Sequence, residues 1–227
     1  EKQVSFEVPR KAELPERLDA VLEVLYLVFN EGYAATSGED WMRPALCEEA
    51  LRLGRVLAGL LPNEPEVFGL LALMELQASR IPARTQADGT PILLPEQSRA
   101  RWDRLQIRRG LNALQHAQRL GGGFGPYALQ AAIAACHARA LRFEDTDWQA
   151  IAALYAQLAR VAPSPVVEAL RDVPPLRCYA PLHAVRGDLL LQLGRNAEAR
   201  AEFTRAAELT GNVRERDVLA ARAATCG

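Results

Sequence analysis

The chain has 227 residues, of which 49% are hydrophobic and 24% are charged, and its formal net charge is −1. This length can bury a sizeable core, in one compact domain or in two small ones. A domain that binds nucleic acid by itself is usually basic, because contacts with phosphate supply most of its affinity. The nearly neutral charge therefore argues against direct DNA binding by this chain.

Cysteine spacing and hydropathy indicate the compartment. The four cysteines stand far apart and form no CxxC pair, and a reduced cysteine in a helix behaves as a small apolar residue. No signal peptide opens the sequence, and no apolar run reaches the roughly 18 residues of a membrane span. We therefore expect a reduced, cytoplasmic protein with no membrane partner. Residues 1–12 are typical of a linker, so we expect the helical domain, residues 13–227, to follow something upstream.

Helical periodicity dominates the first third of the chain. Residues 15–30 carry one apolar row, made of Leu18, Val21, Leu22, Leu25 and Phe29. Residues 43–61 repeat apolar residues at steps of four and three, at Leu46, Ala50, Leu53, Leu57 and Leu60. Residues 65–79 are apolar on most sides, which predicts a central helix.

The pattern breaks at residues 80–96, where Asp88-Gly89 and three prolines favour an ordered loop or a tight hairpin. Further helices are predicted over residues 98–120, 126–140, 148–161, 180–193, 197–210 and 213–223. The chain is therefore predicted to be all-α, with one irregular loop.

Residue spacing in the C-terminal third is typical of a tetratricopeptide pair of helices. Gly187 occupies the small position of the first helix, Ala199 follows 12 residues later, and Phe203 and Ala206 come at steps of four and three. Two weaker copies place Ala50, Pro62 and Ala72, and then Tyr155 and Pro163, at corresponding positions. We predict stacked antiparallel helix pairs in a right-handed, tetratricopeptide-like solenoid, whose groove would hold a peptide or a neighbouring domain.

Motifs that could carry chemistry have simpler structural interpretations. Cys136 and His137 lie within a predicted helix among alanines, with no further ligand at metal-binding spacing. The segment GGGFGP at 121–126 follows a helix rather than a strand, and Pro126 removes one backbone donor, so it is interpreted as a turn rather than a phosphate cradle. We expect no enzyme activity, no metal and no cofactor.

Polar residues flank the irregular loop and form the candidate site. They are Asn30, Glu31, Arg80, Arg84, Asp88, Gln97, Arg101, Trp102 and Asp103. One interpretation is an ion-pair network that fastens a long loop, since its backbone groups must be satisfied. Another is a docking surface on which arginine and tryptophan act as anchors. A third is a pocket in which the arginines bind an anionic small molecule.

Four long motifs resemble one family. They are YLVFNEGYAATSG (26–38), LCEEALRLGRVLAGLLPNEPEVFGLLALM (46–74), GPYALQAAIAACHA (125–138) and DTDWQAIAALYAQLARVAPSPVVE (145–168). The family is the extracytoplasmic-function sigma factors with a tetratricopeptide-like C-terminal extension, and the resemblance runs over residues 8–222. It implies a regulatory extension that contacts the sigma factor's own promoter-reading domains, RNA polymerase or a small partner protein. Those promoter-reading domains would precede residue 1.

The chain departs from this family after Glu168. Members continue there with a further helix and part of its partner, whereas Glu168 runs directly into Ala169 in this sequence. Either the protein has lost about one and a half helices here, or a stretch that it does contain is missing from the sequence between residues 168 and 169. We expect the second, because a true deletion would leave core exposed on both sides.

Overall fold

The structure is a computed structural model that describes residues 14–38, 40–121, 124–162, 180–192 and 194–226. The described part contains nine α-helices and two strands of two residues each, so the all-α prediction is confirmed. No described helix is long and apolar enough to cross a membrane. The predicted linker at 1–12, the junction at 168/169 and Pro163 lie outside the described residues.

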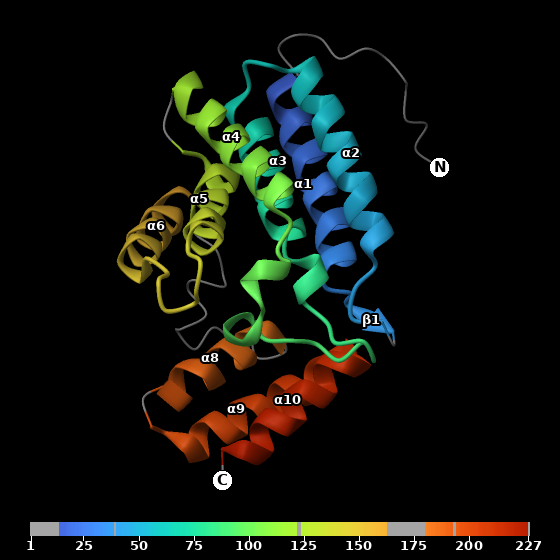
Figure 1. Cartoon of the computed structure of the whole chain (residues 1–227), viewed down its shortest axis with the longest axis vertical. Coiled ribbons are helices and arrows are strands. Elements are labelled where there is room, and N and C mark those ends of the chain that lie inside the picture. Colours follow the sequence, from blue (N-terminus) through green and yellow to red (C-terminus); the bar gives the residue numbers. More distant parts are fainter. Residues whose placement is uncertain (1–13, 39, 122–123, 163–179, 193, 227) are drawn as a thin grey trace.

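Helix α3 (Pro65–Ala78) lies at the centre of the N-terminal part (Figure 1). It packs against α1 (Leu14–Tyr33), α2 (Pro44–Leu60), α4 (Arg104–Leu120) and α5 (Pro126–Arg139). Apolar residues on all sides of α3 are buried, as its sequence predicted. Proline occupies the first helical position of α2, α3 and α5, where its missing N–H costs nothing.

The irregular segment, residues 79–103, connects α3 to α4. It contains three single-turn 3₁₀ helices, Ile81–Ala83, Leu94–Glu96 and Arg99–Arg101. Between the first two, Thr85 and Pro91 form an isolated antiparallel bridge around the turn at Gly89. The expected ordered loop is therefore present and contains a tight hairpin.

The chain continues through α6 (Trp148–Val161), which packs on α5, and then forms α8 (Ala180–Gln192), α9 (Asn196–Leu209) and α10 (Val213–Thr225). Close contacts join α8 to α9. A Cβ atom added to Gly187 would lie 2.7 Å from the ring of Phe203, and the three predicted packing residues of α9 are fully buried.

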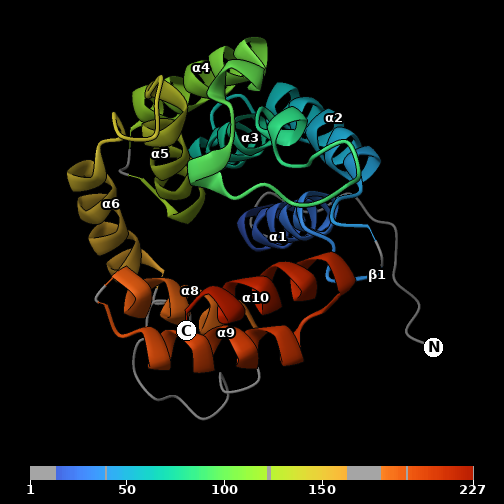
Figure 2. The same cartoon turned by 60° about the horizontal axis from the view of Figure 1, so that its bottom comes forward.

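The C-terminal helices return to the start of the fold and close it into a ring (Figure 2). Strand β1 (Ser37–Gly38), just after α1, pairs in parallel with β2 (Gly211–Asn212), just before α10. The Asn212 side chain, which is fully buried, donates hydrogen bonds to the carbonyl oxygens of Ala35 and Asp40 at 3.0 and 2.9 Å. These contacts connect residues up to 177 positions apart.

Several residues predicted to face the core are exposed instead. Val21, Leu53 and Leu60 are 44%, 38% and 71% exposed, because α1 and α2 end the stack and no described helix covers their outer side. Tyr155, predicted to pack within a repeat, is 50% exposed because α6 contacts α5 through Ile151 and its neighbours instead. The repeat positions Ala50 and Ala72 are fully buried, and Pro62 lies in the turn before α3.

Candidate functional site

Arg84 fastens the irregular segment to the end of α1. Its side chain is 7% exposed, and its Nη1 donates a hydrogen bond to the carbonyl oxygen of Tyr33. The guanidinium carbon lies 3.5 Å from the centroid of the Tyr33 ring and 5.6 Å from that of Trp41. Burial lowers the pKa of Arg84 from its ordinary value. An arginine enclosed in this way holds a loop and cannot anchor a partner.

Trp102 is 2% exposed, so it cannot serve as a surface anchor either. The guanidinium groups of Arg80 and Arg99 lie 5.5 and 4.9 Å from its ring centroid. Arg99, which is 5% exposed, donates to the carbonyl oxygen of Ala140 at 3.0 Å and to the Thr146 hydroxyl at 3.1 Å. Arg99 was not among the predicted site residues, because nothing in the sequence distinguishes it from the neighbouring arginines.

The remaining polar residues of the segment satisfy local backbone groups. The Gln97 amide donates to the carbonyl oxygen of Ile92 at 2.9 Å. Asp103 caps α4 by accepting hydrogen bonds from two backbone N–H groups. Asp88 accepts from the backbone N–H of Thr90 within its own turn. Arg101, in contrast, is exposed. The segment is therefore fastened by hydrogen bonds rather than by the predicted ion pairs; among the described residues, Glu31 is the predicted site residue that forms an ion pair, with Arg43 outside the segment.

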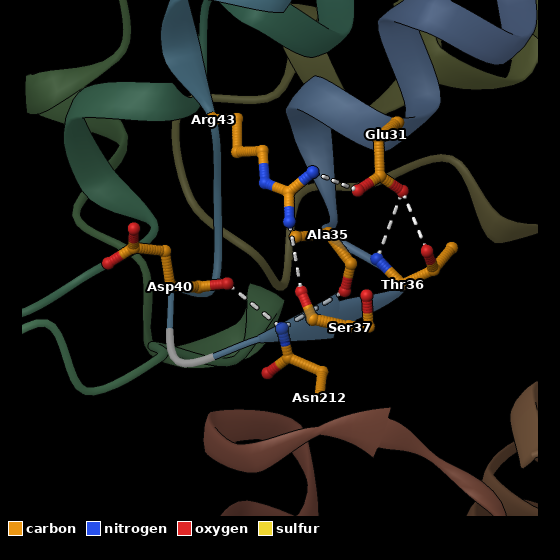
Figure 3. Close-up of polar contacts among 7 residues, drawn as sticks. All are labelled: Glu31, Ala35, Thr36, Ser37, Asp40, Arg43 and Asn212. Atoms are coloured by element: carbon orange, nitrogen blue, oxygen red, sulfur yellow. Dashed lines mark hydrogen bonds and ion pairs between the residues drawn. The ribbon is translucent and has the colours of Figure 1, made fainter.

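Glu31 organises the loop that receives Asn212 (Figure 3). One carboxylate oxygen accepts from the backbone N–H and hydroxyl of Thr36 at 3.1 and 2.9 Å, and the other pairs with Arg43 at 2.8 Å. These contacts, chiefly the backbone hydrogen bond, lower the pKa of Glu31. Arg43 also donates to the carbonyl oxygen of Ser37 at 3.2 Å. Glu31 therefore serves ring closure rather than the irregular segment.

A cavity of about 670 Å³ lies between α1, α3, α5 and α6, beside the second 3₁₀ helix. Of the predicted site residues, Asn30 and Arg80 line this cavity. Its other polar lining residues are Tyr26, Tyr33, Gln77, Gln130, His137 and Tyr155. The pKa of His137 is lowered to about 4, first by burial and then by the positive charges of Arg80 and Arg99. The imidazole is therefore neutral near pH 7.

The α1–α2 hairpin exposes six large apolar side chains. We call this set the α1–α2 face; it consists of Val21, Val24, Leu27, Leu53, Val56 and Leu60, which are 38–71% exposed. The members on each helix follow one another at steps of three or four residues, so each helix presents one row. The two helices pack on α3 through other residues, including Leu22 and Leu51.

No group of three or more His, Cys, Asp or Glu side chains that could hold a metal occurs within the described ranges. Cys136 lies within α5, and burial raises the pKa of its thiol, which disfavours the reactive thiolate. The predicted interpretation of Cys136 and His137 as structural residues agrees with this environment.

Comparisons with known proteins show what parts of this chain are similar to. Residues 17–118 match the model of DUF6596, a family of unknown function, and this region contains the α1–α2 face and the irregular segment. The chain is 46% identical over 231 residues to the uncharacterized protein R00370 of Rhizobium meliloti (strain 1021). That alignment covers 93% of this chain and 54% of the relative, so the chain spans about half the length of the curated relative that it matches. No solved structure matches the chain.

Proposed function

We propose that this chain is a regulatory protein-interaction domain that docks its partner on the α1–α2 face. The proposal rests on one observation: residues of that face have the apolar spacing of a core but are exposed. Val21, Leu53 and Leu60 continue the apolar periodicity of a core, yet they are 44%, 38% and 71% exposed. Large apolar patches on a protein surface mark sites of protein–protein interaction.

The resemblance of the four motifs to one family suggests which kind of partner the chain binds. We propose that the chain is the cytoplasmic C-terminal extension of an extracytoplasmic-function sigma factor, in which helix pairs of tetratricopeptide type stack on one another. Its partner would then be the promoter-reading domains of the same polypeptide. RNA polymerase or a small partner protein would be the alternative occupants of the face. The relative in Rhizobium meliloti is nearly twice as long as the matched region, which leaves room for such domains in that protein.

Reconstituted, promoter-specific transcription tests the proposed role. The full-length polypeptide would be compared with one that lacks residues 1–227. A rise in activity on truncation would identify a built-in inhibitor, and a loss of activity in a folded truncated factor would identify a contact required for initiation. Unchanged promoter activity and unchanged polymerase binding would contradict the proposal.

Point substitutions then test the face itself. Val24→Glu together with Val56→Glu would place two charges on the face, at side chains that are 58% and 50% exposed. We expect the isolated domain to keep its stability, and the full-length protein to reproduce the effect of the truncation. Leu141→Glu is the matched control, because Leu141 is 70% exposed but lies after α5, away from the face. An equal effect of the control and the double variant would place the contact elsewhere. Concentration-dependent dimerisation that only the double variant abolishes would make a second copy the occupant.

A further inference from the structure

The cavity between α1, α3, α5 and α6 has the dimensions of a small-molecule site. Its volume of about 670 Å³ lies within the range of roughly 300–1,000 Å³ that is usual for ligand pockets. Phe29, Leu73, Leu76, Ile133 and Leu158 supply an apolar wall, and eight polar side chains line the same space.

Buried polar atoms of the lining residues lack hydrogen-bond partners. The Tyr33 hydroxyl and the Nδ1 atom of His137 are both buried, and neither has a partner among the described residues. Leaving a buried polar atom unsatisfied costs about 1–3 kcal/mol. Other lining groups are already satisfied, since the Tyr26 hydroxyl donates to the Gln130 side chain at 3.0 Å. The lining residues therefore keep polar atoms whose hydrogen bonds the described residues leave unmade.

Arg80 sets the charge of the site. Its Nε and Nη1 atoms donate to the side-chain oxygens of Gln97 and Gln77 at 3.3 and 3.1 Å. A guanidinium has about five N–H donors, so those left over suffice for the two parallel hydrogen bonds that a carboxylate accepts. None of the described lining residues is acidic, and Arg80 forms no ion pair within the described part of the chain. One half-buried cation without a counter-ion fits one anionic group.

We propose that this cavity binds a small organic acid with one carboxylate and an aromatic or aliphatic body. The carboxylate lies on Arg80, and the body lies against the apolar wall near Ile133 and Leu158. Of the residues predicted for an anion site, Arg80 takes part, whereas Arg84 is committed to Tyr33 and Arg101 is exposed. The binding site does not depend on the partner of the α1–α2 face.

Matched pairs of acid and amide test this proposal on the intact chain. Phenylpropionate, indole-3-acetate and 1-naphthylacetate would each be titrated beside the neutral primary amide, by isothermal calorimetry and ligand-observed NMR. We expect at least one acid to bind with a Kd below about 1 mM and its amide to bind on the order of ten-fold more weakly. Arg80→Gln should reduce that ten-fold difference to less than about two-fold. Arg101→Gln, which makes the same charge change at an exposed site, should leave it unchanged.

A second variant keeps the test decisive if Arg80→Gln impairs folding. Ala134→Phe adds bulk to a residue that lines the cavity without changing its charge, and it should weaken acid and amide alike, by about ten-fold. The paired variant Val24→Glu with Val56→Glu should not affect ligand binding, which separates this site from the docking face. The proposal is overturned if no acid of the panel binds, if Arg80→Gln preserves the preference for the acid, or if Ala134→Phe leaves the affinity unchanged.

Discussion

Replacing Asn212 by alanine should open the ring at the point where its two ends meet. The side-chain amide donates to the carbonyl oxygens of Ala35 and Asp40, at 3.0 and 2.9 Å. Its oxygen accepts a hydrogen bond of 3.0 Å from the backbone N–H of Glu215, which caps the start of α10. Asn212 thus combines a helix cap with a bridge between distant parts of the chain.

The expected loss of stability follows from these three contacts. Removing an N-cap side chain costs about 1 kcal/mol. Each of the two remaining hydrogen bonds contributes about 1 kcal/mol, and more where the carbonyl is left buried and unsatisfied. Asn212→Ala should therefore lower the free energy of unfolding by about 3 kcal/mol. Asn212→Asp keeps the cap but points a carboxylate at two carbonyl oxygens, so it should be at least as destabilising.

Urea unfolding followed by tryptophan fluorescence measures this loss, and hydrogen exchange locates it. In both variants, amides of residues 34–43 and of the start of α10 should exchange faster, because they flank the broken contact. Asn63→Ala, at an exposed turn, is the control and should change stability by less than about 0.5 kcal/mol. A loss below about 1 kcal/mol in Asn212→Asp would show that the two amide donors contribute little, and would refute the reasoning.

Two further predictions concern the glycines and the buried histidine. Gly187→Ala should destabilise the fold by about 1–3 kcal/mol, because the new Cβ would lie 2.7 Å from the buried ring of Phe203. Gly59→Ala in α2, where nothing lies within 4 Å, should stabilise it by about 0.5–1 kcal/mol; thermal unfolding of both variants checks this contrast. The pKa of His137 falls from 6.5 to about 4 on folding, so the unfolded chain binds a proton first and stability decreases as the pH falls through this window. His137→Gln should flatten that part of the stability profile, and parallel profiles of the variant and the native protein would contradict the assignment.

Sequence periodicity predicted the helices because each one buries a row of side chains spaced at three and four residues. It also identified the central helix, since α3 is apolar on all sides and is covered on all sides. The same pattern could not show which rows have a partner within the chain. Val24 and Leu22 belong to neighbouring rows of one helix, yet Val24 is 58% exposed and Leu22 is buried. An apolar row looks the same whether a neighbouring helix or another protein covers it.

The sequence could not predict which side chain caps α5, because that side chain lies on another helix. The N-terminus of α5 has Gly125 at its cap position, so it has no side-chain cap of its own. Glu66, on α3, accepts hydrogen bonds from the backbone N–H groups of Tyr127 and Ala128 at 2.8 and 3.2 Å and takes over that role. The absence of a local cap is readable from Gly125 and Pro126, whereas the distant carboxylate that replaces it is not.

The candidate site could be predicted as a set of residues but not as a geometry. Polar side chains around residues 79–103 were expected to act together, but they contact different partners. Gln97 bonds to the backbone of the segment, Asp103 caps α4, and Arg84 bonds to the end of α1. Arg80, in contrast, donates to the side chains of Gln97 and Gln77 and lies on the cavity wall. His137 is 57 positions further along the chain, and only the packing of α5 against α3 brings it to the same cavity. The spacing of apolar residues along a helix cannot show that Arg80 and His137 line the same cavity.

Ring closure also has a consequence for the order of folding. Helices α1 to α6 form contacts mostly with their neighbours in sequence, whereas the Asn212 bridge joins residues 177 positions apart. Bringing together the ends of a flexible chain of that length costs about 5 kcal/mol in entropy, so this contact is favourable only once the intervening helices have shortened the path. We expect the β1–β2 ladder to form last during folding. In a growing polypeptide, the backbone groups of Ala35 and of strand β1 would then stay unpaired until the residues just before α10 have been synthesised.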